Sequence, residues 1–403
     1  MKNPTKNIHI AGVMMGTSCD GIDTAVCMFM QESGEVSVKE RTSHPFDRSL
    51  KRRILEIQAS AASVSWEEYR TLERDLTRWL SGVLNKSIQT KRKHQIDAFA
   101  IHGSTVCHHP KAKTQPESVQ LLAAPLLAHD LRATVISNFR QGNLERGGQG
   151  APLLPAYHER IVRTAFGTKP VLVINLGGFA NVTFIEFGKT VLGFDTGPAN
   201  VFIDRATHEL TLGRKAFDQN GAQARKQSVN ESTLRALLAH KYFKTPPPKS
   251  TGRDDFTGAF YEATLGKTDG SSRVRTALEL TVFSLRNALE KHVKPKISQL
   301  KNIHRVPTVY VGGGAFNGFL LKRLEEELPW LKPISAESLG WSVTHMEAEG
   351  FAFLGYQALK GLPLGTVATG ANENSAYVGA HILPGEGWQK LLKKLNAHIS
   401  PDA

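Results

Sequence analysis

The sequence has 403 residues, of which 40% are hydrophobic and 22% are charged, as in an ordinary globular protein. This composition excludes global disorder and a collagen-like chain. No apolar run approaches the roughly 20 residues needed to cross a bilayer, and the first residues lack the apolar segment of a signal peptide. A chain of this length exceeds one ordinary core. We therefore expect a cytoplasmic protein of two domains, with no membrane partner.

The charge is strongly basic, because 50 Lys and Arg residues stand against 37 Asp and Glu residues, a formal charge of +13. Such a balance suits nucleic acid, and it equally suits a site for polyanionic nucleotides. The basic residues form scattered groups that are not interleaved with aromatics, as a base-stacking surface requires. The charge therefore favours a solvated basic face and no nucleic-acid partner.

The three cysteines are Cys19, Cys27 and Cys107. Their odd number and the lack of a CxxC spacing argue against a disulfide framework or a zinc site. Cys19 lies within a glycine loop, where we expect it to pack as a small hydrophobe.

The first half of the chain predicts alternating strands and helices. A polar glycine loop separates two apolar segments near the N-terminus, which is typical of a strand, a tight turn and a second strand. A later helical segment contains Pro125, which is expected to kink it. The predicted elements, in order, are strands at 8–15 and 24–30, an amphipathic helix at 66–84, a strand at 96–101, a mostly helical segment at 119–132 and a strand at 133–137.

A glycine cluster at 147–150, followed by Pro152 and Pro155, marks the expected domain boundary. The chain then repeats its opening strand–turn–strand arrangement, which indicates a duplicated α/β architecture. We expect one domain of residues 1–145 plus 366–403 and a second of residues 146–365. The second half predicts strands at 171–175, 181–187, 191–194 and 309–311, helices at 200–210, 276–292, 317–328 and 348–359, and a helical C-terminal end.

Three glycine loops each follow a predicted strand. Glycine lets backbone N–H groups approach phosphate oxygens closely, although a single glycine turn is a weak signal. None of the loops matches the P-loop pattern or a complete GxGxxG after the first strand, which disfavours the folds that carry those patterns. The loops are Gly16-Thr17-Ser18, Gly177-Gly178 and Gly312-Gly313-Gly314.

Two strand–hairpin–strand units with phosphate loops resemble the actin, sugar kinase and Hsp70 superfamily. The resemblance implies a two-domain actin-like ATPase fold of the ribonuclease H-like class, with the nucleotide in the cleft between the domains. The expected cofactors are ATP and Mg²⁺.

The order of the motifs resembles one family within that superfamily. Residues 12–23, GVMMGTSCDGID, resemble the GxMSGTSxDGxD signature of the anhydro-N-acetylmuramic acid kinases, and the similarity extends over residues 10–385. The other matching segments are HGSTV at 102–106, FR at 139–140, GGQGAPL at 147–153, NLGGFAN at 175–181, GFDTGPAN at 193–200, KSTGR at 249–253, GGGA at 312–315, EA at 347–348 and TGA at 369–371.

The resemblance implies an enzyme that opens 1,6-anhydro-N-acetylmuramic acid and phosphorylates it to N-acetylmuramic acid 6-phosphate, with ADP as second product, in peptidoglycan recycling. It also implies domain closure and a homodimer. It assigns catalysis to Asp195 and Glu347, and sugar binding to His102, Arg140, Gln149, Gly150 and Asn175. It assigns nucleotide binding to Gly16, Thr17, Ser18, Cys19, Asp20, Gly21, Ile22, Asp23 and the two later glycine loops.

Each assigned charged residue has a simpler structural interpretation. Asp195 is expected to be the general base, although Asp commonly caps a helix. Glu347 stands before a helical run, where it also suits the helix dipole. Asp20 and Asp23 have the oxygen ligands that Mg²⁺ prefers, and they equally suit capping of the hairpin turn. The Arg140 guanidinium suits the lactyl carboxylate of the sugar.

The sequence departs from the family pattern at several positions. Ser104 stands where Gln is expected, Asn138 and Asn143 stand where Asp is expected, Met15 replaces Ser, and Cys19 replaces Leu. These changes leave open which sugar is bound. The alternatives are a kinase of the same fold for another anhydrosugar or a plain hexose, and a non-catalytic ATP-gated binding protein.

Overall fold

The computed structural model describes residues 7–16, 19–31, 34–60, 63–89, 96–110, 115–252, 255–300, 303–362, 367–371 and 380–396. The predicted nucleotide-loop residues Thr17 and Ser18 lie outside this part of the chain. Contacts divide the protein into two compact units. Unit 1 comprises Met1–Gly150, Glu347–Thr366 and Ala371–Ala403, and unit 2 comprises Ala151–Met346 and Val367–Gly370.

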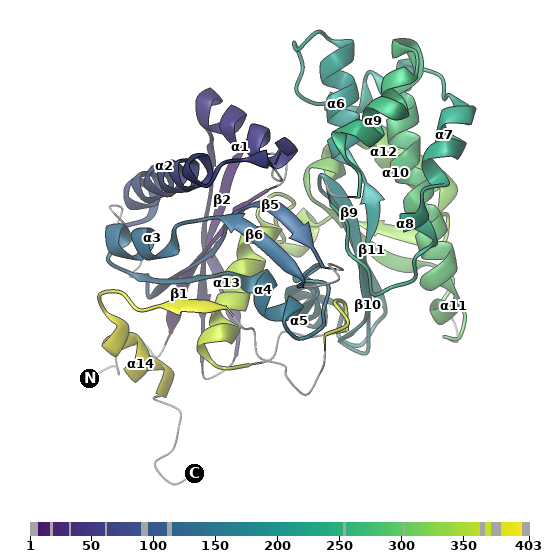
Figure 1. Ribbon diagram of the computed structural model, residues 1–403. Helices are drawn as coiled ribbons and strands as arrows, with labels where there is room; N and C mark the ends of the chain where they lie inside the picture. The colour runs from purple at the N-terminus through teal and green to yellow at the C-terminus, as the bar shows by residue number, and fades with distance from the viewer. Residues whose placement is uncertain are drawn as a thin grey trace. The chain divides into compact units, whose positions relative to one another are not determined.

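Unit 1 is built on a mixed sheet whose strand order is β13-β7-β4-β1-β2-β3. Figure 1 labels two of its strands, β1 and β2, together with the helices of this unit. The first three strands form an antiparallel meander, whereas β4 and β7 run parallel to β1. The strands are β1 (Ile8–Met15), β2 (Gly21–Phe29), β3 (Val36–Pro45), β4 (Ala98–His102), β7 (Thr134–Ser137) and β13 (His381–Leu383), with a separate hairpin of β5 (Ser104–His109) and β6 (Glu117–Leu121).

The helices of unit 1 cover its sheet with apolar side chains. In α2 a capping box between Ser65 and Glu68 fixes the first turn, and leucines at helical spacing from Leu72 to Leu84 enter the core. The helices are α1 (Arg48–Ser60), α2 (Trp66–Leu84) with a π-helical extension (Asn85–Gln89), α3 (Ala124–Leu131), α4 (Phe139–Leu144), α13 (Met346–Leu359) and α14 (Trp388–Asn396).

Helix α13 packs directly on the first strand of unit 1. A Cβ added to Gly12 of β1 would lie 1.9 Å from the carbonyl oxygen of Ala348, so only glycine allows this approach. The rings of Phe29 and Tyr356 stack 4.5 Å apart. These contacts place residues 347–362 in unit 1, whereas the second domain expected from the sequence extends to residue 365.

Unit 2 has a sheet with the strand order β10-β9-β8-β11-β12. Its strands are β8 (Val171–Leu176), β9 (Phe179–Glu186), β10 (Lys189–Pro198), β11 (Val306–Val311) and β12 (Leu331–Ile334). Its core contains the long helix α10 and the inward faces of β8, β9 and β10. The helices are α5 (Pro155–Phe166), α6 (Asn200–Leu210), α7 (Glu231–Leu238), α8 (Lys241–Lys244), α9 (Gly258–Ala263), α10 (Gly270–His292), α11 (Lys294–Ile297) and α12 (Gly318–Glu327).

The two sheets share one topology. In each unit three antiparallel strands are followed by two strands that run parallel to the first, giving β3-β2-β1-β4-β7 and β10-β9-β8-β11-β12. Unit 1 adds β13 at one edge. This duplicated arrangement is the actin-like, ribonuclease H-like fold, so the predicted fold class is confirmed.

The prediction of a mostly helical segment at 119–132 is wrong in its first part. Strand β6 pairs with β5 in the register Ser104↔Leu121, and α3 begins only at Ala124. Pro125 occupies the first turn of α3, where its missing N–H costs no hydrogen bond, and it therefore starts the helix rather than kinking it. Among the helices of the described residues, none is long and apolar enough to cross a bilayer.

Candidate functional site

The glycine turn between β8 and β9 is bound to the start of α6. The carbonyl oxygen of Gly178 accepts N–H groups from Ala199 at 2.9 Å and Val201 at 3.1 Å. The carbonyl of Gly177 accepts the N–H of Asn200 at 3.1 Å. The turn and the helix N-terminus therefore form one fixed backbone surface.

The second glycine loop of unit 2 meets this turn. Gly312 follows β11, the parallel neighbour of β8, and its φ of +79° favours glycine. A Cβ at Gly312 would lie 2.3 Å from Asn175 Oδ1, and one at Gly314 would lie 2.7 Å from the Leu176 side chain. Residues Gly313–Phe316 form a short 3₁₀-helix. The predicted loops Gly177-Gly178 and Gly312-Gly313-Gly314 thus come together.

Asn175, predicted to bind sugar, lies at the junction of these two loops. Its neighbour Leu176 accepts a hydrogen bond from Asn200 Nδ2 at 2.9 Å, which ties α6 to the end of β8. In open α/β sheets ligands bind at the carboxyl ends of parallel strands, and the positive end of a helix dipole favours phosphate. The junction suits a nucleotide, and the Asn175 side chain packs against Gly312 within it.

Asp195 lies near the end of β10 and is 6% exposed. Its Oδ2 accepts the backbone N–H of Thr251 at 2.9 Å, and its own N–H donates to the carbonyl of Lys249 at 3.2 Å. The Tyr242 hydroxyl donates to the Asp195 carbonyl at 2.5 Å. The strand register shifts between Asp195 and Gly197. Asp195 is thus held from three sides within a strand and does not cap a helix.

The residues around Asp195 were not selected as site residues from the sequence. Lys249 is almost fully buried, its Nζ donates to the Tyr242 carbonyl at 3.3 Å, and it lies 4.3 Å from the centre of the Tyr242 ring. The Thr251 hydroxyl donates to Asp255 at 3.0 Å. Burial raises the pKa of Tyr242 well above its usual value, and the negative charges of Asp195 and Asp255 add to the shift. In the sequence, the KSTGR motif at 249–253 was the signal that could have identified Lys249 and Thr251 as site residues.

The strand register relates Asp195 to the glycine junction. Asp195 lies opposite Asn181 of β9, which lies opposite Asn175 of β8. Directly opposed residues share one face of a sheet, and neighbouring strands lie about 4.8 Å apart. The carboxylate and the glycine junction therefore belong to the same face and the same edge of the unit 2 sheet.

His102 and Arg140 of unit 1 form a hydrogen-bonded pair. Arg140 Nε donates to His102 Nε2 at 2.8 Å, and Arg140 Nη1 donates to the carbonyl of Gly150 at 2.9 Å. Burial lowers the pKa of His102 well below its usual value, with the Arg140 charge adding to the effect. A neutral imidazole can accept at Nε2, as this bond requires. Gln149, half-buried, precedes Gly150 in the same loop.

The two asparagines that depart from the family pattern have defined structural roles. Asn143 is buried, and its Oδ1 accepts the N–H of Gly150 at 2.8 Å. Asn138 has a φ of +61°, a conformation that Asn tolerates better than most residues. Its Nδ2 lies 3.3 Å from His381 Nε2. At position 143 the loop requires an oxygen that accepts the Gly150 N–H, and it does not require a negative charge.

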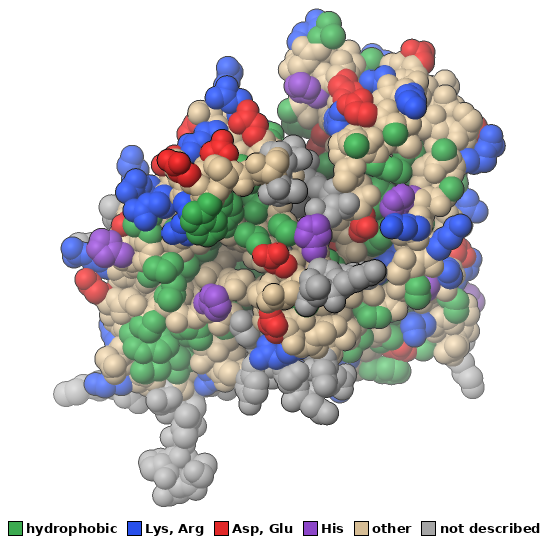
Figure 2. All heavy atoms as spheres, in the orientation of Figure 1, with side chains coloured by type: hydrophobic (Ala, Val, Ile, Leu, Met, Phe, Trp, Pro, Cys, Tyr) green, Lys and Arg blue, Asp and Glu red, His purple; other side chains and the backbone are tan. Residues whose placement is uncertain are grey.

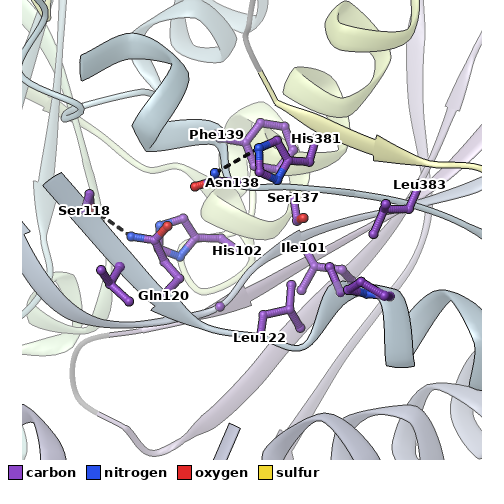
Figure 3. A pocket seen from close by; sticks show the side chains of 14 residues that line it. Ile101, His102, Ser118, Gln120, Leu122, Ser137, Asn138, Phe139, His381 and Leu383 are labelled. Carbon is purple, nitrogen blue, oxygen red and sulfur yellow. Dashed lines mark hydrogen bonds between the residues drawn. The ribbon is translucent and has the colours of Figure 1, made fainter. Parts of the chain in front are cut away.

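A pocket of about 340 Å³ opens beside His102 in unit 1 (Figure 3). Its lining includes Asn138 and the Ser118–Gln120 pair, in which the Gln120 amide donates to the Ser118 hydroxyl at 2.8 Å. The remaining lining residues are mostly apolar and include Ile101, Leu122, Pro125, Phe139 and Leu383.

The first predicted nucleotide loop has mixed surroundings. Cys19 and Ile22 are buried in the core, so their side chains are structural and only their backbone is available to a nucleotide. Gly21 packs against β3, because an added Cβ would lie 2.2 Å from the His44 carbonyl oxygen. The N–H of Cys19 donates to the carbonyl of Gly16 at 3.1 Å, which closes the loop.

Asp20 and Asp23 are engaged with neighbouring side chains. The exposed Asp20 carboxylate pairs with Lys51 Nζ at 2.5 Å, and Asp23 accepts the Ser43 hydroxyl. The described residues include no group of three or more His, Cys, Asp or Glu side chains that could hold a metal ion. The two carboxylates therefore do not fit a Mg²⁺ site built by protein ligands alone.

Glu347 lies in the first turn of α13 and is half-buried. The nearby Glu349 is 3% exposed, and its Oε1 pairs with Arg41 Nε at 2.6 Å. Glu349 therefore has a clear structural role in fixing α13 to β3. On the face shown in Figure 2, Lys and Arg side chains are spread out and interspersed with acidic ones.

The duplicated topology, with glycine loops at strand ends and a buried carboxylate at the same end of the unit 2 sheet, defines a protein of the actin-like fold. The family model for anhydro-N-acetylmuramic acid kinase matches residues 8–384. An anhydro-N-acetylmuramic acid kinase of Xylella fastidiosa is 35% identical over 370 residues, covering 90% of this chain and 92% of that protein. One of Hahella chejuensis is 34% identical over 383 residues, covering 92% and 97%. The chain belongs to the anhydro-N-acetylmuramic acid kinase family.

Among solved structures, the ethanolamine utilization protein EutJ from Carboxydothermus hydrogenoformans is 11% identical and covers 87% of this chain and 90% of that one, with a TM-score of 0.39.

Proposed function

We propose that this chain hydrolyses the internal bond of 1,6-anhydro-N-acetylmuramic acid and phosphorylates the freed oxygen with ATP, in peptidoglycan recycling. The products are N-acetylmuramic acid 6-phosphate and ADP. The observation that carries the proposal is Asp195, a buried carboxylate fixed by a backbone N–H within a member of this kinase family.

In the proposed reaction Asp195 acts as a general base. The carboxylate takes one proton from a water molecule, and the water oxygen forms a bond to C1 of the sugar. The C1–O6 bond breaks, O6 bonds to the γ-phosphorus of ATP, and the bridging oxygen leaves with ADP. This combines the base half of an inverting glycosidase with a loose phosphoryl transfer.

The hydrogen bonds around Asp195 support this role. The Thr251 N–H fixes Oδ2, and the Lys249 and Tyr242 contacts fix the Asp195 backbone. A carboxylate held in one orientation loses little freedom when water and sugar bind, which favours the reactive geometry. Thr251 and Tyr242 are therefore positioning residues for the base.

The backbone of the glycine loops is proposed to bind the nucleotide phosphates. Gly177, Gly178 and Gly312–Gly314 meet at the start of α6, where the positive end of the helix dipole favours anions. Mg²⁺ carried by the nucleotide would neutralise charge on the transferring phosphoryl group. Asp20 and Asp23 would contact that ion only through water or after release of Lys51 and Ser43.

The sugar is proposed to contact the unit 1 loop that holds Arg140. The guanidinium suits the lactyl carboxylate, and its position is set by His102 and Gly150. Gln149 and Glu347 are proposed to contact or orient the sugar and the attacking water.

The experiment compares wild-type protein with Asp195→Asn, using 1,6-anhydro-N-acetylmuramic acid, ATP and Mg²⁺. General-base assistance is worth roughly 10²–10⁴-fold, so we expect kcat to fall by about 10²-fold or more. ADP affinity and melting temperature should stay unchanged. Asp269→Asn, at an exposed position of the same unit, is the control and should keep full activity. Near-normal turnover by folded Asp195→Asn would refute the role of Asp195.

We also propose, from the family resemblance, that the protein works as a homodimer in the cytoplasm. Sedimentation velocity at micromolar concentration should give a particle of about twice the 44.2 kDa chain mass. A single monomeric species across that concentration range would contradict the dimer.

A further inference from the structure

A buried polar cluster joins three segments of unit 1 that are distant in the sequence. Cys19 ends the first nucleotide loop, Gln58 lies near the end of α1, and Ser104 begins β5. Their exposed fractions are 0%, 9% and 1%. Polar side chains buried to this degree are normally held by hydrogen bonds to one another or to the backbone.

The carboxamide of Gln58 is the centre of this cluster. Its Oε1 accepts the Cys19 thiol at 3.4 Å, and its Nε2 donates to the Ser104 hydroxyl at 3.4 Å and to the Thr105 carbonyl at 2.9 Å. Cys19 Sγ also lies 3.9 Å from Ser104 Oγ. One side chain therefore bridges the nucleotide loop and the strand that follows His102.

The backbone at Cys19 needs such support. Its φ of +54° is in the left-handed region, which is uncommon for residues other than glycine, asparagine and aspartate. The N–H of Cys19 donates to the carbonyl of Gly16 at 3.1 Å. The buried hydrogen bond from the Cys19 thiol to Gln58 Oε1 helps to hold this backbone conformation.

The cluster also explains two departures from the family pattern together. The pattern has Leu at position 19 and Gln at position 104, whereas this chain has Cys19 and Ser104. The serine side chain is shorter than that of glutamine by a carboxamide group and a methylene. Gln58 brings a carboxamide to the Ser104 hydroxyl from α1, and Cys19 provides a polar atom for it to contact.

We propose that Gln58 is a positioning residue for the nucleotide loop: its carboxamide supplies, from α1, the amide that the family pattern carries at position 104, and thereby holds Cys19, at the end of that loop, ready for the nucleotide. This inference rests on the proposed function only in taking that loop to bind ATP or ADP. It does not depend on which sugar is phosphorylated.

The test measures ADP affinity by isothermal titration calorimetry, together with melting temperature. Gln58→Leu keeps the approximate volume and removes the amide. Loss of a buried hydrogen-bonded group is worth about 1–3 kcal/mol, so the Kd for ADP should rise by about 5-fold and at most about 150-fold. Gln227→Leu is the matched control. Gln227 also bonds backbone groups, those of Gly270 and Val274, but in unit 2. This variant should lower the melting temperature and leave ADP affinity within twofold.

The decisive variant returns the carboxamide to position 104. Gln58→Ser should weaken ADP binding, and the double variant Gln58→Ser/Ser104→Gln should recover most of the affinity. Cys19→Ala removes the thiol contact with little change in volume and should also weaken ADP binding. It replaces Gln58→Leu as the test variant if Gln58→Leu does not fold.

Two results would overturn the proposal. One is an ADP affinity in Gln58→Leu or Cys19→Ala within twofold of wild type while melting falls, as for Gln227→Leu. The other is a double variant that binds ADP no better than Gln58→Ser. Because neither readout uses the sugar, a lack of sugar phosphorylation with intact ADP binding would refute only the proposed reaction.

Discussion

The side-chain oxygen of Asn143 holds the loop at 148–150 without the negative charge of the Asp that the family pattern has at this position. Its side-chain oxygen accepts the Gly150 N–H at 2.8 Å, and its backbone carbonyl accepts the Gly148 N–H at 3.0 Å. The Gly150 carbonyl in turn accepts Arg140. An asparagine oxygen serves this purpose as an aspartate oxygen would, so the departure at position 143 does not by itself disrupt the proposed sugar loop.

We predict that Asn143→Leu destabilises the protein by about 1–3 kcal/mol, because the Gly150 N–H is left buried without an acceptor. It should also raise the KM for the anhydrosugar, since Arg140 loses its fixed partner. Asn143→Asp keeps the acceptor and should come closer to wild type in both properties. Chemical denaturation and steady-state kinetics check this, and equal effects of the two variants would contradict it.

Buried histidines make stability depend on pH. Burial lowers the pKa of His158 to about 3, and its Nδ1 lies 2.9 Å from the Thr183 hydroxyl. Above about pH 6.5 the residue is neutral in the folded and the unfolded chain. Between that pH and about 3 only the unfolded chain binds the proton, so the free energy of unfolding falls as the pH falls.

We predict a loss of about 1.4 kcal/mol per pH unit from His158 within that window, measured as urea midpoints from pH 7.5 to 5. His158→Gln should reduce the pH slope. His129→Gln is the control, because the His129 side chain is 85% exposed, and its slope should equal that of wild type. An unchanged slope in His158→Gln would show that the residue is already protonated in the folded protein.

At the scale of elements, helix α13 is as important to unit 1 as the strands on which it packs. It comes from a distant part of the sequence and approaches β1 closely enough that Gly12 faces the backbone of Ala348 and Ala352. A backbone neighbour cannot move away as a flexible side chain can. The hairpin that carries the first nucleotide loop therefore depends on this helix.

We predict that Gly12→Ala lowers stability by about 1–3 kcal/mol or more through overpacking, with α13 displaced from β1. Gly82→Ala is the matched control, since no atom lies within 4 Å of the added Cβ in α2, and alanine should stabilise that helix by about 1 kcal/mol. Thermal denaturation of both variants is the measurement. A melting temperature of Gly12→Ala at or above that of wild type would contradict the packing argument.

Elements with a strong local pattern could be predicted from the sequence, and long-range pairings could not. The strand at 8–15 and the helices at 66–84 and 200–210 agree with β1, α2 and α6. Strand β6 was missed because apolar residues before Pro125 also fit a helix, and β13 depends on pairing with β7 far away in the chain. The Asp195–Thr251 and Gln58–Ser104 contacts join residues 56 and 46 positions apart, a separation at which local patterns carry no information.

At the scale of the whole molecule, the chain consists of two units with one sheet topology and different loops. Unit 2 carries the glycine junction and Asp195, whereas unit 1 carries the first nucleotide loop and the His102–Arg140 pair. The shared fold fixes where strand ends lie, and the chemistry depends on what each end carries. In the proposed function, unit 2 would supply the base and phosphate-binding backbone, and unit 1 would supply a guanidinium that suits the carboxylate of the sugar.

The most direct test of this account follows the origin of the oxygen at C1. The protein is incubated with ATP, Mg²⁺ and 1,6-anhydro-N-acetylmuramic acid in ¹⁸O-water, and the product is analysed at once by mass spectrometry. We predict a sugar 6-phosphate with one ¹⁸O at C1, formed in equal amount to ADP, and almost none with Asp195→Asn. A phosphorylated product that retains the anhydro ring, or one formed without ¹⁸O, would contradict the coupled reaction.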